Sequence, residues 1–451
     1  MRTTRLIALT AAIGVSFLLV PSRAAQTAHP SFTTLYSFTG QNGDGNGPEG
    51  NLAIGRNGAL YGTTAGGGIA NSSICPFYGP TGCGTVFALA PPAAPGAAWT
   101  ESVLHQFTGQ NGDGFYPFAG VVIGSNGVLY GATYYGGAGA GCQEPMGCGT
   151  VYQLTPSAVA GGAWTETILH GFTGQDGDGS GPVGTLAIGK DGALYGMTVY
   201  GGPVTTRCPV GCGIVFQLTP PSTAGGTWTE TVIYSPSGQS LALGSVPDAG
   251  LTIDKNGSLY GTATAEPEPA GSYGTVFRLT PPDTTGGEWM RTILFSFNLL
   301  DGATPMGNVA IGPGGKIFGA TAQGGGGDCP GLACGTVFEL SPPAAAGTPW
   351  TEDYCSFGTC ASGWGPMVGV VIDKNGVLYG ATPHGGPLDS STVFALMPPA
   401  AAGAPWTQTA LHSFASGTQV RGLAIGSSGV LYGTILSGGA LGAGSIFAWT
   451  P

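Results

Sequence analysis

The sequence predicts an all-β fold, a seven-bladed β-propeller of four-stranded antiparallel blades whose last blade is completed by an N-terminal strand at 31–38. Three observations lead to this prediction. The 451 residues include 86 Gly and 35 Pro, and both types oppose helix interiors. Each repeat contains four strand-length segments, which is typical of a propeller rather than of a β-solenoid with its shorter coils. A phrase such as NGALYG recurs seven times, with its aromatic residue at Tyr61, Tyr130, Tyr195, Tyr260, Phe318, Tyr379 and Tyr432.

The first unit shows how each segment is predicted. Residues 51–55 (NLAIG) are short and apolar, as expected of an inner strand that is buried on both faces. An Asn-Gly pair then supplies the positive φ of a tight turn into 59–64 (ALYGTT). The third segment is 84–90 (GTVFALA). A Pro/Ala/Gly hairpin joins it to 99–107 (WTESVLHQF), whose alternating pattern predicts a half-exposed outer strand.

The ring is expected to close through the N-terminal segment. The final unit ends after its third segment, SIFAWTP, and residues 31–38 (SFTTLYSF) read like the end of an outer strand. Closure would remove the free strand edges that invite aggregation. The Trp that opens an outer strand recurs with the units, which indicates packing between blades rather than sugar stacking. It occurs at Trp99, Trp164, Trp228, Trp289, Trp350 and Trp406.

The N-terminus predicts export. A basic start, an apolar run at 6–20 and small residues at Ser22 and Ala24 indicate a signal peptide over 1–24, cleaved after Ala24. A short lead at 25–30 and a single propeller domain at 31–451 would follow. The apolar run is shorter than the roughly 20 residues that span a bilayer. The expectation is a secreted monomer without membrane insertion.

The charge balance excludes two classes of partner. The formal net charge is −11, and only 8% of residues are charged. Nucleic-acid binding requires basic patches that replace counterions, and anionic membranes attract basic segments. The sequence therefore predicts no nucleic-acid partner and no binding to an anionic membrane surface.

The repeated pattern resembles a known family. The units read P-x-x-x-x-L-A-I-G-x-x-G-x-L-Y-G, then G-C-G-T-V-F-x-L-x-P, then W-T-E. They resemble the GloVer tandem repeat of exported bacterial proteins, described as choice-of-anchor proteins, over about 31–451. The resemblance implies an extracellular or cell-surface location and no known activity. Surface attachment stays open, because no C-terminal sorting segment is recognisable.

One edge of the ring carries nearly all the sequence variety. It holds the loop between the second and third strands of each blade and the crossover to the next blade, and it is called here the variable face. Binding loops on rigid scaffolds tend to vary in this way. All cysteines fall there, and in an exported chain they predict five local disulfides rather than metal ligands. Protection from proteolysis explains such bridges nearly as well as a recognition surface. The expected pairs are Cys75/Cys83, Cys142/Cys148, Cys208/Cys212, Cys329/Cys334 and Cys355/Cys360.

Three crossovers suggest calcium. Asp44, Asp113 and Asp178 each lie in an N/D-G-D-G run and could offer carboxylate oxygens. However, no Glu closes a coordination sphere, and four of the seven crossovers lack the motif. We favour Asp/Asn-Gly turns. The expectation is therefore no metal and no cofactor, with Ca²⁺ as the alternative.

Other candidates are aromatic or imidazole groups on the variable face. Those for a carbohydrate or peptide surface are Tyr134, Tyr135, Tyr200, Trp364, Phe77 and Tyr78, and His384 is a candidate ligand contact. The remaining histidines indicate packing, because the slot of His105, His170 and His412 in the outer strand is filled in sister units by Tyr234, Phe295 and Tyr354.

The expected function is non-enzymatic: binding or scaffolding at the cell surface or outside the cell, with a glycan or protein ligand. One alternative is a secreted carbohydrate-active enzyme, a lyase or hydrolase, using acids such as Asp44, Asp113 and Asp178. Another is a structural envelope or matrix component. No nucleophile elbow or phosphate loop occurs, so no catalytic residue is predicted. An enzyme should place two carboxylates within about 10 Å in a deep pocket, whereas a binding module should show an aromatic shelf.

Overall fold

The computed structural model describes most of the chain after the N-terminal segment. The predicted signal peptide and lead up to residue 29 lie outside it, as do Phe77, Tyr78, Cys329 and Cys360. The described residues are 30–69, 75, 82–94, 96–137, 139, 142, 146–159, 161–204, 208–223, 225–235, 250–264, 273–284, 286–326, 334–345, 347–357, 363–385, 390–397 and 404–451.

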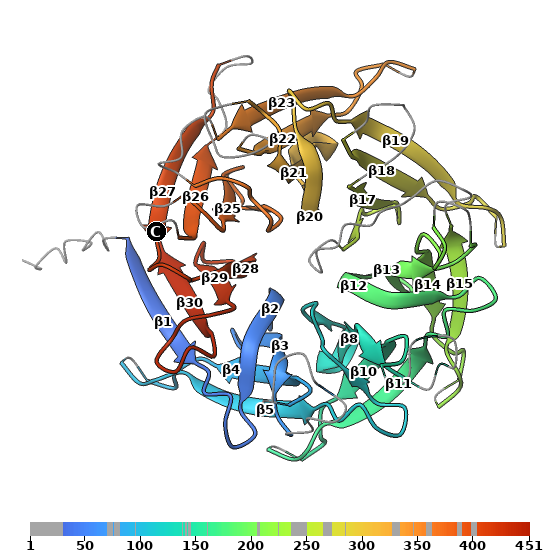
Figure 1. The fold of residues 1–451 in the computed structure, drawn as a ribbon, viewed down its shortest axis with the longest axis vertical. Helices are drawn as coiled ribbons and strands as arrows, with labels where there is room; N and C mark the ends of the chain where they lie inside the picture. Colours follow the sequence, from blue (N-terminus) through green and yellow to red (C-terminus); the bar gives the residue numbers. More distant parts are fainter. Residues whose placement is uncertain are drawn as a thin grey trace, which may run out of the picture.

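Seven four-stranded antiparallel sheets form a ring, which confirms the predicted propeller (Figure 1). Blades one to three comprise β2 (Gly45–Ile54), β3 (Leu60–Gly67), β4 (Thr85–Ala90) and β5 (Thr100–Gln106); β7 (Val122–Ile123), β8 (Leu129–Thr133), β10 (Thr150–Thr155) and β11 (Thr165–Gly171); and β12 (Gly179–Ile188), β13 (Leu194–Gly201), β14 (Val215–Thr219) and β15 (Thr229–Tyr234). A small extra sheet beside blade two pairs β6 (Gly114–Phe115) with β9 (Tyr135–Gly136).

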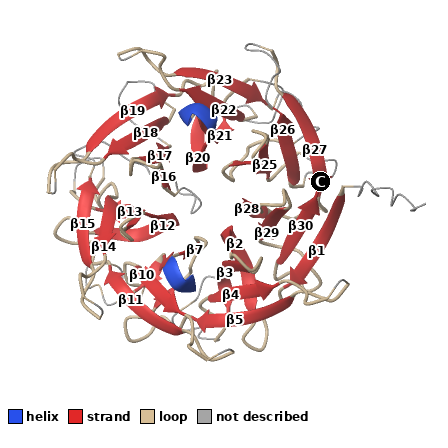
Figure 2. Cartoon of the chain, turned by 180° about the vertical axis from the view of Figure 1, so that it is seen from behind, coloured by secondary structure: helices blue, strands red, loops and turns tan. Residues whose placement is uncertain are grey.

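The remaining blades repeat the same order. Blades four to six comprise β16 (Thr252–Ile253), β17 (Leu259–Ala263), β18 (Thr275–Thr280) and β19 (Met290–Ser296); β20 (Ala303–Ile311), β21 (Ile317–Gln323), β22 (Thr336–Ser341) and β23 (Thr351–Ser356); and β24 (Val371–Ile372), β25 (Leu378–Thr382), β26 (Thr392–Met397) and β27 (Thr407–Ser413). Short 3₁₀ turns at Ser125–Gly127 and Pro313–Gly315 join inner strands (Figure 2). Among the described residues, no helix is long and apolar enough to cross a membrane.

The seventh blade draws strands from both ends of the chain. It comprises β28 (Val420–Ile425), β29 (Leu431–Ile435), β30 (Ser445–Thr450) and the N-terminal β1 (Ser31–Ser37). Strand β1 pairs antiparallel with β30, from Ser31 opposite Thr450 to Ser37 opposite Ser445. The predicted closure by 31–38 is therefore confirmed, and the outer edge of β30 is covered.

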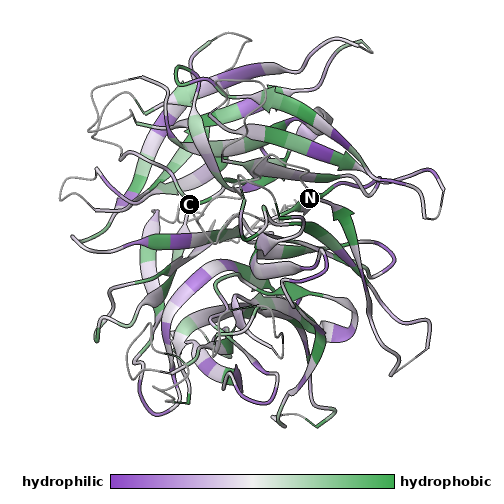
Figure 3. Cartoon of the chain, turned by 45° about the vertical axis from the view of Figure 1, so that its right-hand side comes forward, coloured by the Kyte–Doolittle hydropathy of each residue, from purple (hydrophilic) through white to green (hydrophobic). Residues whose placement is uncertain are grey.

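The repeated motifs meet in the core of each blade. A Cβ on Gly62 of the first LYG phrase would lie 2.7 Å from Phe87 Cζ of the following GTVF phrase, so only glycine leaves room for that ring. The next blade repeats this with Gly131 against Tyr152. Because the two motifs pack on one another, they recur together. Hydrophobic residues are accordingly spread along the strands of the whole ring (Figure 3).

Aromatic pairs join neighbouring blades, as the recurrence of Trp predicts. Trp164 of the second blade lies 6.4 Å from Tyr61 of the first, measured between ring centroids, and Trp228 of the third lies 5.9 Å from Tyr130 of the second. A Phe follows six of the seven outer strands and packs against an aromatic ring of the next blade. The first of these contacts joins Phe38 edge-on to Phe87, with ring centroids 5.1 Å apart. Aromatic rings bury large areas and favour such edge-to-face contacts, so the seams between blades carry much of the core.

Candidate functional site

A hollow lies on the variable face, between the second and third blades. Its volume is about 680 Å³. One wall is the loop after β8, the other is the loop after β13, and the floor comes from the crossover into β12. The lining residues are Tyr134, Tyr135, Cys142, Met146, Gly147, Gly174, Ser180, Gly181, Tyr200, Gly201, Val204, Pro209 and Val210. Three tyrosines that the sequence singles out, at 134, 135 and 200, are thus brought together.

Local structure sets the orientation of the two adjacent tyrosines. Strand β9 pairs Tyr135 with Phe115 of β6, and the two rings stack at 5.3 Å. Tyr134 lies nearly perpendicular to Tyr135, with ring centroids 4.7 Å apart. Its ring also lies against the backbone of the third blade, where a Cβ on Gly181 would be only 3.2 Å from Tyr134 Cζ. A side chain at position 181 would therefore displace the aromatic wall.

Disulfides hold both walls. Cys142–Cys148 lies in the first wall, and the Ser180 hydroxyl donates a hydrogen bond to Cys142 Sγ at 3.1 Å, which ties this loop to the crossover. Cys208–Cys212 spans the second wall around Pro209 and Val210. Short bridges of this kind chiefly limit the shapes available to a loop.

Three of the five predicted disulfides are confirmed, the third being Cys75–Cys83. Cys334 is also disulfide-bonded, while its expected partner Cys329 lies outside the described residues. The fifth prediction is wrong: Cys355 is a free thiol. It sits within strand β23, paired with Val337, where its side chain belongs to the packed blade rather than to the loop that carries residue 360.

The pocket is neutral and partly apolar. None of the described residues that line it carries a formal charge. Burial, followed by the neighbouring hydroxyls of Tyr200 and Tyr135, raises the pKa of Tyr134 well above its ordinary value, so its phenol stays protonated. Tyr200 is 44% exposed, and Val204 and Val210 are 70% and 62% exposed at the rim. The arrangement offers aromatic faces, hydroxyls and backbone amides to an uncharged ligand.

Trp364 and His384 meet elsewhere on the ring. Their rings stack at 4.6 Å with 24° between the planes, and the backbone N–H of Trp364 donates to the His384 carbonyl at 2.9 Å. His384 also lines a hollow of about 160 Å³ beside Arg421 at the start of the seventh blade. These two predicted residues thus belong together, but not to the tyrosine pocket.

The three GDG aspartates are engaged by their own loops. Thr39 donates to Asp44 Oδ2 from its backbone N–H and its hydroxyl, both at 2.7 Å. Thr108 repeats this with Asp113, and Thr173 with Asp178. The residue two positions earlier has a positive φ in all three loops: 55° at Asn42, 55° at Asn111 and 54° at Asp176. These contacts favour the interpretation as turns.

Calcium binding by these loops stays an open alternative, and it makes a prediction. Because the carboxylates already accept hydrogen bonds within the loop, we expect the same thermal midpoint with millimolar Ca²⁺ as with a calcium-selective chelator. Differential scanning calorimetry of the purified chain measures this. A calcium-dependent rise that Asp44→Asn removes would contradict the interpretation as turns.

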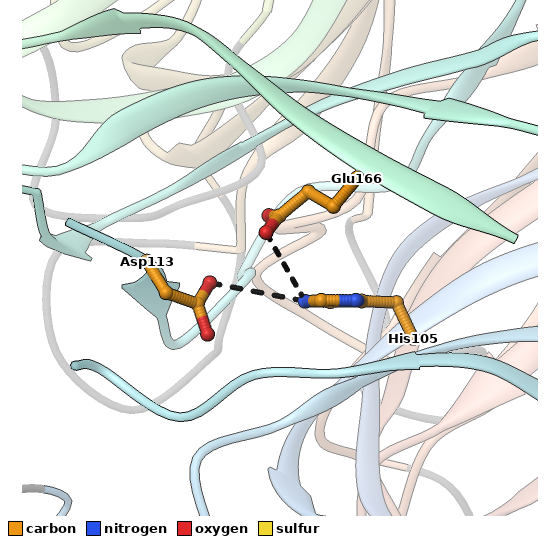
Figure 4. A group of neighbouring side chains, drawn as sticks. All are labelled: His105, Asp113 and Glu166. Carbon is orange, nitrogen blue, oxygen red and sulfur yellow. Dashed lines mark ion pairs between the residues drawn. The ribbon is translucent and has the colours of Figure 1, made fainter. Parts of the chain in front are cut away.

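The slot of His105 has polar neighbours that the sequence does not reveal. His105 Nε2 lies 3.8 Å from Asp113 Oδ1 and 3.6 Å from Glu166 Oε2 of the next blade (Figure 4). His170, Asp178 and Glu230 form the same group one blade further on. The missed signal is that both histidines stand eight residues before a GDG aspartate. The Glu of W-T-E completes each group only through contact between blades.

Register corrects one assignment to this slot. His105 pairs with Val86, and the residue opposite the equivalent Val337 is Cys355 rather than Tyr354. Most outer strands contain a bulge beside this Val, whereas β23 pairs without one. Without the bulge, Cys355 rather than Tyr354 occupies the slot. The Tyr354 side chain points outward and is 39% exposed.

Burial perturbs the carboxyls of these seams. In the seam between the first and second blades, burial followed by the Asp113 charge raises the pKa of Glu166 to about 7, although His105 opposes the rise. Burial lowers the pKa of His105, but Asp113 and Glu166 outweigh it, so that the pKa lies above its ordinary value. Burial and Asp44 likewise raise the pKa of Glu101 to about 7 in the seam where Tyr36 replaces the histidine.

Comparisons with known proteins identify relatives of the sequence and of the fold. A family model described as the Gloeobacter/Verrucomicrobia repeat matches residues 23–203, 73–328 and 207–447. No curated protein matches the sequence. A streptogramin B lyase structure is similar at 15% identity and a TM-score of 0.52, covering 94% of this chain and 97% of that one. A luciferin-regenerating enzyme is similar at 13% identity and a TM-score of 0.41, covering 94% and 96%. At these identities the likeness concerns the fold alone.

Proposed function

The chain belongs to the Gloeobacter/Verrucomicrobia repeat family, as its repeated motifs predict, and we propose that it is a secreted, non-enzymatic protein that binds a neutral glycan segment on its variable face. The observation that carries this proposal is the tyrosine pocket between the second and third blades. The disulfides in its walls support a site of defined shape and an oxidising location outside the cell.

The chemistry of the pocket favours a sugar. Tyrosine presents an apolar ring face together with a polar hydroxyl, and a pyranose likewise has apolar C–H faces edged by hydroxyls. Tyr134, Tyr135 and Tyr200 supply such groups, and Ser180 adds another hydroxyl. No charged side chain lines the described walls, and the chain has a formal net charge of −11, so an anionic polymer would be repelled. An uncharged glycan fits these conditions.

The position of the acids favours binding over turnover. Glycoside hydrolysis uses two carboxylates that flank one bond in the substrate site. In the described part of the chain no carboxylate lines the tyrosine pocket, and the close carboxylate pairs lie in the seams between outer strands instead. Among its described residues, the site therefore lacks the carboxylate pair that glycoside hydrolysis uses.

The proposal predicts that binding depends on the exposed tyrosine. Tyr200→Ala is expected to weaken binding of the best glycan from an array by roughly tenfold, because one stacked ring is lost. Tyr273→Ala is the matched control, since Tyr273 is 46% exposed in the loop after β17, away from the pocket. Isothermal titration calorimetry of both variants and the original chain measures the difference.

The rival functions give different results in the same assay. Release of reducing or unsaturated sugar ends would support a lyase or hydrolase and overturn the proposal. Binding to peptides but not to glycans would assign the pocket to a protein ligand. Absence of binding to both glycans and peptides would favour a structural component of the envelope or matrix. Equal affinities of the Tyr200→Ala and Tyr273→Ala variants would remove the pocket from any binding that is found.

A further inference from the structure

The seam between the first and second blades, called here the first seam, brings together three potential metal ligands. His105 comes from outer strand β5, Asp113 from the crossover that follows it, and Glu166 from outer strand β11 (Figure 4). We propose that these three side chains form a binding site for a divalent first-row transition metal, with Zn²⁺ as the probe. The proposal is independent of the tyrosine pocket, which lies in the next seam.

The spacing of the ligand atoms fits a small cation. His105 Nε2 is 3.6 Å from Glu166 Oε2 and 3.8 Å from Asp113 Oδ1. Zinc binds nitrogen and oxygen at about 2.0 to 2.2 Å, so ligand atoms around one ion stand about 3.3 to 3.8 Å apart in tetrahedral or trigonal geometry. One ligand atom from each residue lies within 4.8 Å of the others. Small side-chain shifts would therefore complete the geometry.

Polar atoms of all three side chains lack hydrogen-bond partners. His105 Nε2 and Asp113 Oδ1 are buried without a hydrogen-bond partner among the described residues, and so is Glu166 Oε1, the second oxygen of the carboxylate whose Oε2 faces His105. The distances of 3.6 and 3.8 Å are too long for hydrogen bonds between them. Buried polar atoms are normally satisfied, and a cation would satisfy a nitrogen and two carboxylates together. Imidazole among the ligands favours a transition metal over calcium.

The surroundings of Asp113 support the assignment. Its Oδ2 atom accepts hydrogen bonds from the Thr108 backbone N–H at 2.7 Å and from the Thr108 hydroxyl at 2.6 Å. These bonds fix the carboxylate and leave Oδ1 facing the seam. Hydrogen bonds from outside the coordination shell commonly orient carboxylate ligands in metal sites in this way.

Equivalent seams in the same ring are satisfied differently. In the second seam His170 Nε2 lies 3.4 Å from Asp178 Oδ1, and that oxygen also accepts the Gly179 N–H at 2.6 Å. Where β27 meets β1, His412 stacks on Phe32 at 3.9 Å instead of facing a carboxylate. Among the seams whose three positions are described, the first seam therefore has the most buried ligand atoms without a hydrogen-bond partner.

Zinc titration of the purified full chain tests the proposal. We expect one equivalent to bind by calorimetry, with its retention by the protein confirmed by elemental analysis after gel filtration. His105→Phe is expected to weaken this binding at least about tenfold. The fold should tolerate the change, because Phe295 occupies the equivalent slot in the fourth blade. His412→Phe and His170→Phe are the matched controls, and both should retain the equivalent.

A second variant and a second measurement guard against misfolding. Asp113→Asn keeps the size of the side chain and should also weaken zinc binding at least about tenfold. Zinc at a hundred times its dissociation constant should raise the thermal midpoint of the original chain and leave that of His105→Phe unchanged. Absence of zinc binding, zinc binding that survives in His105→Phe, or loss of the same ion in His412→Phe or His170→Phe would overturn the assignment.

Discussion

Removing residues 31–38 is expected to lower the thermal midpoint by about 10 °C or more and to promote self-association. Strand β1 covers the outer edge of β30 along its whole length, from Ser31 to Ser37. Without it, β30 exposes unpaired N–H and C=O groups. Phe38, which is 1% exposed and lies edge-on to Phe87, is lost as well. The ring then opens at the only blade that joins the two ends of the chain.

A single substitution separates the packing contribution from the pairing contribution. Phe38→Ala should lower the free energy of unfolding by about 3 to 5 kcal/mol, the usual cost of deleting a buried ring. Thr34→Ala, at an exposed position of the same strand, should change it by less than about 0.5 kcal/mol. Urea unfolding followed by fluorescence measures both, and gel filtration reports association of the truncated chain. A truncated chain with an unchanged melting curve would show that closure does not stabilise the ring.

Raising the pH from 5 to 9 is expected to destabilise the protein, and Glu352→Gln should remove part of that loss. Glu352 lies in the seam between the fourth and fifth blades, and its Oε1 atom is buried without a hydrogen-bond partner among the described residues. Burial, followed by the charges of Asp301 and Asp353, raises the pKa of Glu352 to about 8. The protonated form is therefore favoured in the folded protein.

The direction follows from proton linkage. The folded state binds this proton more tightly than the unfolded chain, whose glutamates titrate near pH 4.3. The contribution to stability is complete below that pH and disappears as the pH rises through about 8. After allowance for partial exposure, Glu352→Gln should raise the free energy of unfolding at pH 9 by on the order of 1 kcal/mol.

The control for this measurement is Glu288→Gln, an exposed glutamate in the turn between β18 and β19. Urea unfolding at pH 5, 7 and 9 compares the two variants with the original chain. Parallel stability curves for Glu352→Gln and the original chain would exclude this carboxyl as a source of the pH dependence. A stability that rises with pH in the original chain would contradict the sign.

Repetition explains which predictions succeeded. Gly62 and an aromatic residue equivalent to Phe87 recur in every unit, with Tyr152 in the second, and the structure packs each such pair in contact. The same holds for the Trp and Tyr of adjacent units, such as Trp164 and Tyr61. A contact repeated from unit to unit leaves a periodic trace in the sequence, so fold, strand order and closure could be predicted without coordinates.

A contact that occurs at only one seam leaves no periodic trace in the sequence. Tyr134 and Tyr200 are 66 positions apart in the sequence, and their shared pocket appears only when two blades are placed side by side. The register of β23 likewise decided that Cys355, rather than Tyr354, fills the slot of His105. A one-residue difference in bulging changes which side chain points inward, and in the sequence it shows only as one residue fewer between Trp350 and Phe357 than between Trp99 and Phe107.

The sequence by itself determined the ring, its seven repeats, the strand that closes it and the face on which variety gathers, because each depends on local pattern repeated along the chain. Only the tertiary structure decided which variable residues share a pocket and which polar groups share a seam. The GDG loops illustrate the division: the sequence identified their glycines and aspartates as turns, while the fold placed Asp113 opposite His105 and Glu166. Distances across blades depend on packing, and a sequence pattern contains no measure of them.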